Sequence, residues 1–477
     1  MEAHIRRAVT DGVFRVAKLS RAIRGSNPDH PYLQGLHTPM TAELTIENLA
    51  VTGDIPPALN GLYARNGPNP FEPKQTATHH WFVGDAMVHG IRLRDGKALW
   101  YRNRWLRSTR LSNALGEPPV PGPRSPIGAE VANTNVIRHA NKLWAIVEAG
   151  AYPIEVSAGL DTLRMSDFSG TLGPGFSAHP HLDPDTNELH AVCYYGANQG
   201  RIWHVVVDEH GRVRRREPIP VNHGPMIHDC MITESYVLVF DLPVTFSMQA
   251  MVRGARLPYE WNPKHNARIG LLPREGQAED IVWCPIDPCF FFHAANAYEN
   301  DNGEVVLDAC VHATMFQPGA TGPDSRATPF ERFVLDPRTA HASRTIIDAT
   351  SQEFPRPDER RIGKPYRYAY TAGLADQSQP GFNADSRLYK HDLINRTRET
   401  RDFGEHRVLG EFVFVPSRED SDEDEGWLLG LVIDAHADTT DLVILNAQDV
   451  TGAMVATITV PHRIPPGFHG NFLPLPD

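Results

Sequence analysis

Four of the 23 histidines in the chain lie in segments of apolar and turn-forming residues, where an unpaired imidazole would be costly to bury. These are His179, His228, His293 and His469. Imidazole is a ligand that suits iron, copper, zinc and nickel. A set of nitrogen ligands without a thiolate argues against a structural zinc centre. If the fold brings the four side chains together, they would form a metal site.

Three glutamates, Glu148, Glu353 and Glu411, lie in or beside apolar runs of strand length. A carboxylate in such a run costs several kcal/mol of desolvation unless it is paired. Histidines that bind a metal generally donate their second N–H to a carboxylate, which fixes the ring. Each glutamate alone could be a strand residue that faces solvent. Beside the four histidines, the set favours a metal centre whose ligands are oriented by carboxylates.

Composition and motifs exclude several other classes of function. The formal net charge of −12 argues against nucleic-acid binding. The sequence shows no catalytic triad, no phosphate-binding loop and no sign of an obligate protein partner. The five cysteines are too sparse for a disulfide framework, and Cys284 and Cys289 lack the tight paired spacing of a zinc site. These features predict a protein of the reducing cytoplasm.

Short apolar runs separated by turn-forming residues fill the chain beyond residue 50. Runs of strand length occupy residues 142–148, 202–208, 236–242, 304–312, 427–433, 442–445 and 455–460. The 40 prolines disfavour a mostly helical protein, because proline breaks helix interiors. The pattern predicts an all-β protein, and a β-propeller would leave only short, protected edges. Inner strands of different blades converge on one axis, where histidines far apart in the chain could meet.

The length of 477 residues exceeds the roughly 250–300 residues at which a single core stops growing. A repeat architecture escapes that limit, because each repeat buries its face against its neighbours. We therefore expect a single propeller domain over residues 41–477, preceded by an N-terminal segment over residues 1–40. Residues 243–275 are apolar, rich in methionine and irregular, so we expect them to form part of a cap over one face of the propeller.

Apolar and basic residues alternate over residues 6–24, which predicts a basic amphipathic helix. Such a helix either lies on an anionic membrane surface or packs on its own domain, and the sequence leaves both open. No run of about 18 apolar residues is present, so no membrane-spanning helix is expected. The membrane alternative would make this a cytoplasmic protein with peripheral membrane contact.

Between residues 60 and 470 the chain resembles the carotenoid cleavage oxygenase family, which includes apocarotenoid-forming enzymes and lignostilbene dioxygenases. The motifs that carry the resemblance occur in the family's order: Asn60–Pro70, His80–His89, Ala178–Pro180, His228–Asp229, Phe292–His293, Glu353–Arg356, Glu411–Pro416 and Pro466–Gly470. The sequence departs from the family's pattern at Val83 and Ala86, where Asp and Gly would stand. That segment carries no metal ligand, so the departure concerns only the local turn.

The resemblance implies a seven-bladed β-propeller capped by a dome of helices and loops, with one non-haem Fe(II) on the propeller axis. It assigns the four iron ligands to His179, His228, His293 and His469. It also assigns to Glu148, Glu353 and Glu411 the role of orienting the last three histidines. All seven positions hold the expected residue type.

The reaction that the resemblance implies is dioxygen-dependent cleavage of a C=C bond into two carbonyl products, with an apolar small molecule as substrate. Met226, Phe292 and Phe354 are candidates for the wall of an apolar substrate tunnel, and they are equally candidates for ordinary core. Residues 99–114 are more similar to the carotenoid-cleaving branch, which favours a carotenoid or apocarotenoid. The alternatives are a stilbene or phenylpropenoid substrate, non-oxidative isomerisation as in one branch of the family, and a metal-free binding scaffold.

Overall fold

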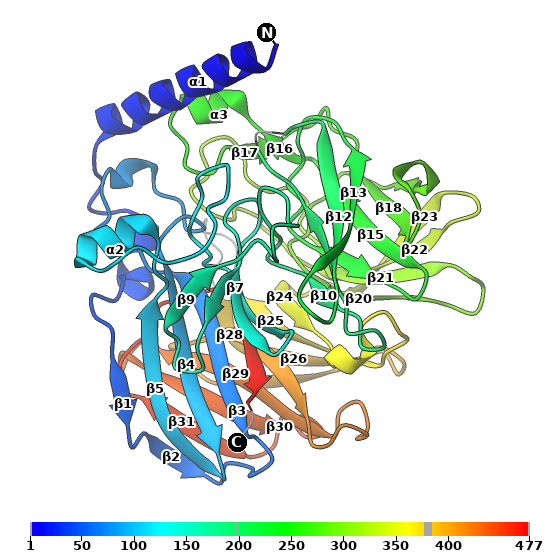
Figure 1. Ribbon diagram of the computed structural model, residues 1–477. Coiled ribbons are helices and arrows are strands. Elements are labelled where there is room, and N and C mark those ends of the chain that lie inside the picture. The colour runs from blue at the N-terminus through cyan, green and yellow to red at the C-terminus, as the bar shows by residue number, and fades with distance from the viewer. Residues whose placement is uncertain (1, 197, 376–383, 476–477) are drawn as a thin grey trace.

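Seven sheets of four or five antiparallel strands form the body of the protein within residues 2–196, 198–375 and 384–475, which the computed structural model describes (Figure 1). They are the blades of a β-propeller, as the sequence predicted. The blade nearest the N-terminus also contains the C-terminal strand. Its strands are β1 (Thr45–Glu47), β3 (Gly61–Pro68), β4 (Ala86–Arg94), β5 (Lys97–Trp105) and β32 (Gly470–Pro474). The last blade also contains an N-terminal strand. Its strands are β2 (Ala50–Gly53), β28 (Arg407–Pro416), β29 (Gly426–Asp434), β30 (Thr439–Asn446) and β31 (Ala456–Val460).

The five blades between them each have four strands that occur in one stretch of the chain. The first consists of β6 (Asn135–His139), β7 (Lys142–Ile146), β8 (Ile154–Val156) and β9 (Thr162–Met165). The second consists of β10 (His181–Leu182), β11 (Leu189–Cys193), β12 (Arg201–Val207) and β13 (Val213–Pro220). The next consists of β14 (Cys230–Ile232), β15 (Tyr236–Asp241), β18 (Arg268–Pro273) and β19 (Val282–Pro285). The fourth consists of β20 (Ala294–Glu299), β21 (Val305–Cys310), β22 (Phe330–Asp336) and β23 (His341–Asp348). The fifth consists of β24 (Gln352–Arg356), β25 (Tyr368–Leu374), β26 (Ala384–Asp392) and β27 (Thr397–Asp402).

The ring of blades is closed twice by strands from opposite ends of the chain. In the first closure β32 pairs with β3, and in the second β2 pairs with β31. One edge strand of each blade contacts the corresponding strand of the next, in the succession β10, β14, β20, β24, β28, β32 and β6. These seven strands are therefore the innermost ones and surround the propeller axis.

Buried apolar clusters lie between neighbouring blades, and the largest joins the β14–β19 and β20–β23 blades. Its members include Phe240, Phe291 and Phe333, whose rings contact one another edge to face or tilted. All seven runs predicted to be strands from the sequence coincide with strands, from β7 to β31. Their apolar composition, their short length and the turn-forming residues between them are the signals that made the prediction work.

A cap covers one face of the propeller and contains β16 (Val244–Phe246), α3 (Met248–Val252) and β17 (Tyr259–Trp261). The expected cap insertion over residues 243–275 was too long, because residues 268–273 form β18 of a blade. Ile269, Leu271 and Leu272 are fully buried there, and β18 pairs with β15 along its whole length. Apart from the N-terminal helix, the other helical elements of the described residues are α2 (Thr109–Leu115) and the single turns Pro31–Leu33, Gly35–His37, Thr76–Thr78, Ala278–Asp280 and Glu359–Arg361.

The helix predicted for residues 6–24 is α1 (Glu2–Arg24), which lies over the cap and contacts α3 (Figure 1). The Ser20 hydroxyl donates a 2.8 Å hydrogen bond to the carbonyl oxygen of Val252. The side chains of residues 2–11 and of Phe14 lie outside the described part of the helix. No helix among the described residues is long and apolar enough to cross a membrane. All five cysteines are buried and unbonded to one another.

A pair of buried histidines in the β10–β13 blade predicts that acid destabilises the protein. His190 Nδ1 lies 3.2 Å from His204 Nε2. Burial, helped by nearby arginines, lowers the pKa of His190 to about 3, and burial also holds the pKa of His204 well below its ordinary value. Both rings stay neutral in the folded state, whereas both take up a proton below pH ~6.5 in the unfolded state. The free energy of unfolding therefore keeps its full value above pH ~6.5 and falls as the pH drops below it, because only the unfolded state takes up these two protons.

We expect each ring to cost about 2 kcal/mol of unfolding free energy between pH 7 and pH 5. Urea denaturation of the wild type and of a His190→Leu/His204→Leu double variant at both pH values measures this. The double variant should lose several kcal/mol less than the wild type over that range. An identical loss in both proteins would contradict the assignment.

Candidate metal centre

Each blade contributes one of the seven residues singled out from the sequence. His179, His228, His293 and His469 lie at most two residues before the innermost strands β10, β14, β20 and β32. Glu353 and Glu411 lie within the innermost strands β24 and β28, and Glu148 lies two residues after β7. Because the innermost strands surround one axis, residues up to 290 positions apart (His179 to His469) come together there.

The four histidines form a compact, buried cluster. One ring nitrogen from each lies within 4.8 Å of those of the others. His228 Nε2 is 3.4 Å from His293 Nε2, and the ring centroids of His179 and His469 are 4.5 Å apart. His179 Nε2 is buried and has no hydrogen-bond partner among the described residues. A buried nitrogen without a partner is costly, and a metal ion at the centre of the cluster would satisfy it, so these residues fit a metal.

Three of the four rings are paired with carboxylates on the side away from the cluster. His293 Nδ1 donates to Glu353 Oε2 at 2.7 Å, and His469 Nδ1 donates to Glu411 Oε1 at 3.0 Å. His228 Nδ1 lies 3.2 Å from Glu148 Oε1, an ion-pair distance without hydrogen-bond alignment. A proton held on Nδ1 leaves the Nε2 lone pair free to point at the centre. Glu353 and Glu411 thus accept the hydrogen bonds expected from the sequence, Glu148 lies close to His228 without one, and the effect of the three glutamates on a bound metal stays a prediction.

Two irregularities in the strands aim the carboxylates at the axis. The register of β24 shifts between Glu353 and Arg356, and Phe354 has a φ of +54° there. The register of β28 shifts between Leu409 and Phe412, on either side of Glu411. A bulge of this kind changes the direction of a side chain relative to the regular pleat. A positive φ is strained for a non-glycine residue, and such strain concentrates at functional sites.

The Glu353 and Glu411 carboxylates are ionised and the His179 ring is neutral. Burial favours a high pKa for the Glu411 carboxyl, but Arg356 and His469 outweigh it and hold that pKa at about 2. Burial acts on Glu353 in the same direction, and His293 and His312 hold its pKa well below the usual range. Burial together with the other three histidines lowers the pKa of His179 well below its ordinary value. A neutral imidazole beside anionic partners is the state in which a metal cation binds.

Several residues that support the site were missed in the sequence analysis. His312 Nε2 contacts the second oxygen of Glu353 at 3.1 Å, and Nδ1 of the same ring is 3.0 Å from the Thr328 hydroxyl. Tyr194 donates a 3.0 Å hydrogen bond to Glu148 Oε2, and Arg356 Nη1 lies 3.1 Å from Glu411 Oε2. Most of these contacts join residues that are more than 40 positions apart. No local pattern could have signalled them.

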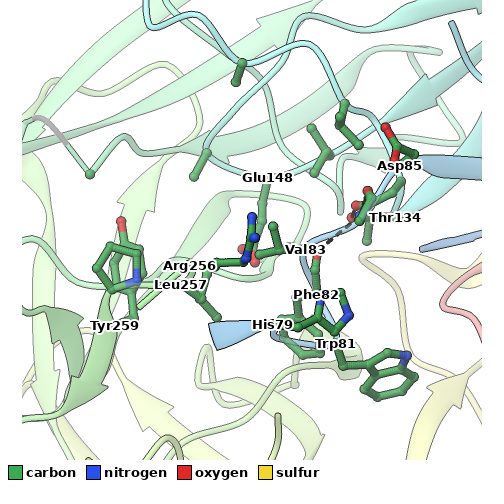
Figure 2. A pocket seen from close by; sticks show the side chains of 18 of the residues that line it. His79, Trp81, Phe82, Val83, Asp85, Thr134, Glu148, Arg256, Leu257 and Tyr259 are labelled. Carbon is green, nitrogen blue, oxygen red and sulfur yellow. Dashed lines mark hydrogen bonds between the residues drawn. The ribbon is translucent and has the colours of Figure 1, made fainter. Parts of the chain in front are cut away.

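A cavity of about 1070 Å³ opens from the cluster toward the cap. His228, His293, His469 and Glu148 line it on the side of the axis, and aromatic rings make up much of the wall (Figure 2). The candidate wall residues Phe292 and Phe354 do line this cavity. Phe292 contacts the His228 ring edge to face, with centroids 4.9 Å apart, and Phe354 stacks on His293 at 5.3 Å.

Met226 does not line the cavity, contrary to one of the two roles considered for it. Its backbone N–H donates to the Val244 carbonyl oxygen at 2.8 Å, which ties this segment to the cap strand β16. The side chain is buried in the largest apolar cluster and is ordinary core. Val83, one of the two departures from the family's pattern, lines the cavity, whereas Ala86 is buried at the start of β4.

Comparison with known proteins gives likenesses over nearly the whole chain. A model of the retinal pigment epithelial membrane protein family matches residues 37–474. The carotenoid cleavage oxygenase of Mycobacterium tuberculosis is 39% identical over an alignment of 497 positions. The alignment covers 94% of this chain and 99% of the relative. The solved structure of Pseudomonas brassicacearum lignostilbene dioxygenase has a TM-score of 0.84 at 25% identity, covering 94% of this chain and 99% of that one. Cobalt-substituted apocarotenoid oxygenase of Synechocystis has a TM-score of 0.80 at 26% identity, covering 91% and 96%.

The fold and the axial cluster of histidines and carboxylates therefore define an enzyme of the oxygenase class. The chain belongs to the family that contains the retinal pigment epithelial membrane protein and the carotenoid cleavage oxygenases.

Proposed function

We propose that this enzyme is a non-haem Fe(II) dioxygenase that cleaves a C=C bond of a carotenoid or apocarotenoid into two carbonyl products. The observation that carries the proposal is the buried four-histidine cluster at the end of a large cavity with aromatic walls. The names of its relatives, a carotenoid cleavage oxygenase and an apocarotenoid oxygenase, support the substrate class. Dioxygen is the second substrate.

His179, His228, His293 and His469 would hold the iron, which would supply the redox chemistry that adds oxygen to the alkene. The hydrogen bonds to Glu353 and Glu411 hold the ring proton of His293 and His469 on Nδ1, so the opposite nitrogens stay available. Phe82, Phe292 and Phe354 surround the open side of the cluster; Phe82 and Phe292 have ring centroids 5.7 Å apart. These rings exclude water and hold a flat, conjugated chain beside the centre. The reaction needs no acid or base, in keeping with the absence of a catalytic triad from the sequence.

Two other reactions of the same site compete with this proposal. The structural likeness to lignostilbene dioxygenase favours cleavage of a stilbene or phenylpropenoid. The match to the retinal pigment epithelial membrane protein family keeps non-oxidative isomerisation as another alternative. The cavity of about 1070 Å³ is larger than most small-molecule sites, which favours a long polyene over a stilbene.

Anaerobic purification, followed by iron analysis and by assays with an apocarotenoid and a hydroxystilbene, separates these reactions. We expect close to one iron per chain and two carbonyl products from the apocarotenoid, only when oxygen is admitted. Turnover without oxygen would favour isomerisation, and turnover of the hydroxystilbene alone would favour the stilbene reaction. A protein without bound iron would contradict every version of the proposal.

We further propose that α1 rests on an anionic membrane surface, from which an apolar substrate enters the cavity. Val16, Leu19 and Ile23 follow one face of the helix and are 47%, 62% and 77% exposed. Arg15, Lys18 and Arg24 lie on the exposed part of the same helix. Val13 of α1 and Met248 and Met251 of α3 line the cavity, so its outer end lies beneath this surface. Apolar side chains flanked by basic ones are typical of helices that lie in a membrane interface.

Sedimentation with vesicles that contain phosphatidylserine tests the membrane contact. A Leu19→Glu/Ile23→Glu variant should lose most of its binding, because two charges would enter the lipid interface. Ile394→Glu is the matched control, since Ile394 is 69% exposed but lies in the turn between β26 and β27. Equal binding by the helix variant and the control would show that α1 serves only to cover its own domain.

A further inference from the structure

Arg256 is a cation in the cavity wall without a carboxylate partner among the described residues. Its Nη2 donates to the carbonyl oxygens of Lys74 and Gln75, at 2.9 and 3.3 Å. Its Nε is buried and has no hydrogen-bond partner in the described part of the chain. The other arginine in the wall, Arg110, forms an ion pair with Asp85. Arg256 is thus distinguished by hydrogen-bonding capacity that the protein leaves unused.

Arg256 places this capacity in the part of the cavity wall that the cap contributes. It lies in the cap between α3 and β17, and Figure 2 shows its side chain in the middle of the lining residues, between Tyr259 and Val83. Burial lowers the pKa of Arg256, and the positive charge of Arg21 on α1 lowers it further. Two neighbouring cations make the cap side of the cavity wall electropositive, whereas the Glu148 carboxylate lies beside His228.

A guanidinium group has only donors, so its partner must be an oxygen with free lone pairs. A hydrocarbon polyene cannot supply one, and burying the guanidinium beneath it would leave donors unsatisfied. A carbonyl or carboxylate at the end of the polyene can accept these donors directly. A site that hydrogen-bonds a substrate group discriminates strongly against the analogue that lacks it.

We propose that Arg256 binds a carbonyl or carboxylate oxygen at one end of the polyene and so selects an apocarotenoid over an unsubstituted carotenoid hydrocarbon. This inference rests on the proposed function and specifies the substrate of the same cavity. With the oxygen held at Arg256, the number of carbons between it and the histidine cluster determines which double bond is cleaved. Arg256 is therefore a residue for specificity and positioning.

Binding of three polyenes of equal length tests the proposal. One ends in an aldehyde, one ends in a carboxylate, and the third is a hydrocarbon without a terminal oxygen. Quenching of tryptophan fluorescence reports binding, because Trp81 lines the cavity. Arg256→Met should weaken binding of the aldehyde and the acid about 10–100-fold and leave the hydrocarbon nearly unchanged. Arg256→Lys should recover part of the affinity for the acid. Arg253→Met is the matched control, because Arg253 is exposed, pairs with Glu260 at 3.0 Å and does not line the cavity.

In turnover, Arg256→Met should raise KM for the aldehyde with little change in kcat, and it should also broaden the set of bonds that are cleaved. Equal affinity of the wild type for all three polyenes would overturn the proposal. Equal weakening of all three in Arg256→Met would also overturn it, because that result indicates a merely structural role. If the iron-loaded wild type cleaves none of the three, the proposed function fails, and the binding measurements still decide whether Arg256 recognises a terminal oxygen.

Discussion

A His293→Ala variant is expected to lose its iron and, with it, all cleavage of the alkene. His293 has contacts with all three other cluster histidines and with Glu353, and it lines the inner end of the cavity. Alanine removes one of four nitrogen donors and leaves the buried Glu353 carboxylate without one of its two histidine partners. Iron analysis after desalting and an oxygen-uptake assay measure the two losses.

The control for this experiment is another buried histidine outside the cluster. His139 is buried at the end of β6 and its Nε2 is 2.7 Å from the Asp208 carbonyl oxygen. His139→Ala should keep its iron, whereas Glu353→Gln should keep the fold and weaken the affinity for iron about 10–100-fold. Retention of iron in both His293→Ala and Glu353→Gln would mean that these residues do not form the metal site.

An Arg356→Met variant is expected to lose about 3–5 kcal/mol of unfolding free energy, measured by urea denaturation of the metal-free protein. The guanidinium of Arg356 is the buried cation beside Glu411, which its Nη1 contacts. Its Nη2 donates a 2.8 Å hydrogen bond to Asn471 and forms an ion pair with Glu359. Methionine fills a similar volume but leaves the Glu411 carboxylate without its main counter-charge. A single buried charge without its partner costs more than the pair contributes.

The double variant Arg356→Met/Glu411→Gln separates this charge effect from a loss of packing. Removing the unpaired carboxylate should restore a large part of the stability that Arg356→Met alone loses. Strictly additive losses in the two single variants and the double variant would show that Arg356 acts through packing and not through Glu411.

The sequence indicated which residues meet on the axis better than it predicted the boundaries of the elements around them. His179 and Glu411 could be singled out because a polar side chain in an apolar run needs a partner, whatever the fold. The end of the cap could not be predicted, because the apolar residues of β18 resemble those of the preceding segment until their pairing with β15 is known. Met226 failed as a wall residue for a similar reason, since nearness to His228 in the chain does not determine which way a side chain points.

The partners of the carboxylates could not be predicted for a different reason. His312 and Tyr194 reach Glu353 and Glu148 only because neighbouring blades pack side by side. Arg356 was visible in a motif, but its ion pair with Glu411 spans two blades. Even the direction of Glu353 depends on the irregular register of β24, which a pattern of alternating residues does not show.

Because of the double closure of the propeller, a metal bound at the centre would also hold the ring of blades together. His469 directly precedes β32, the strand that completes the first closure, and the other three histidines belong to three further blades. A bound ion would therefore connect four blades, so that the ring could not open without releasing the ion. Because ligands that bind only the folded state stabilise it, loading with metal would also stabilise the closed ring against unfolding.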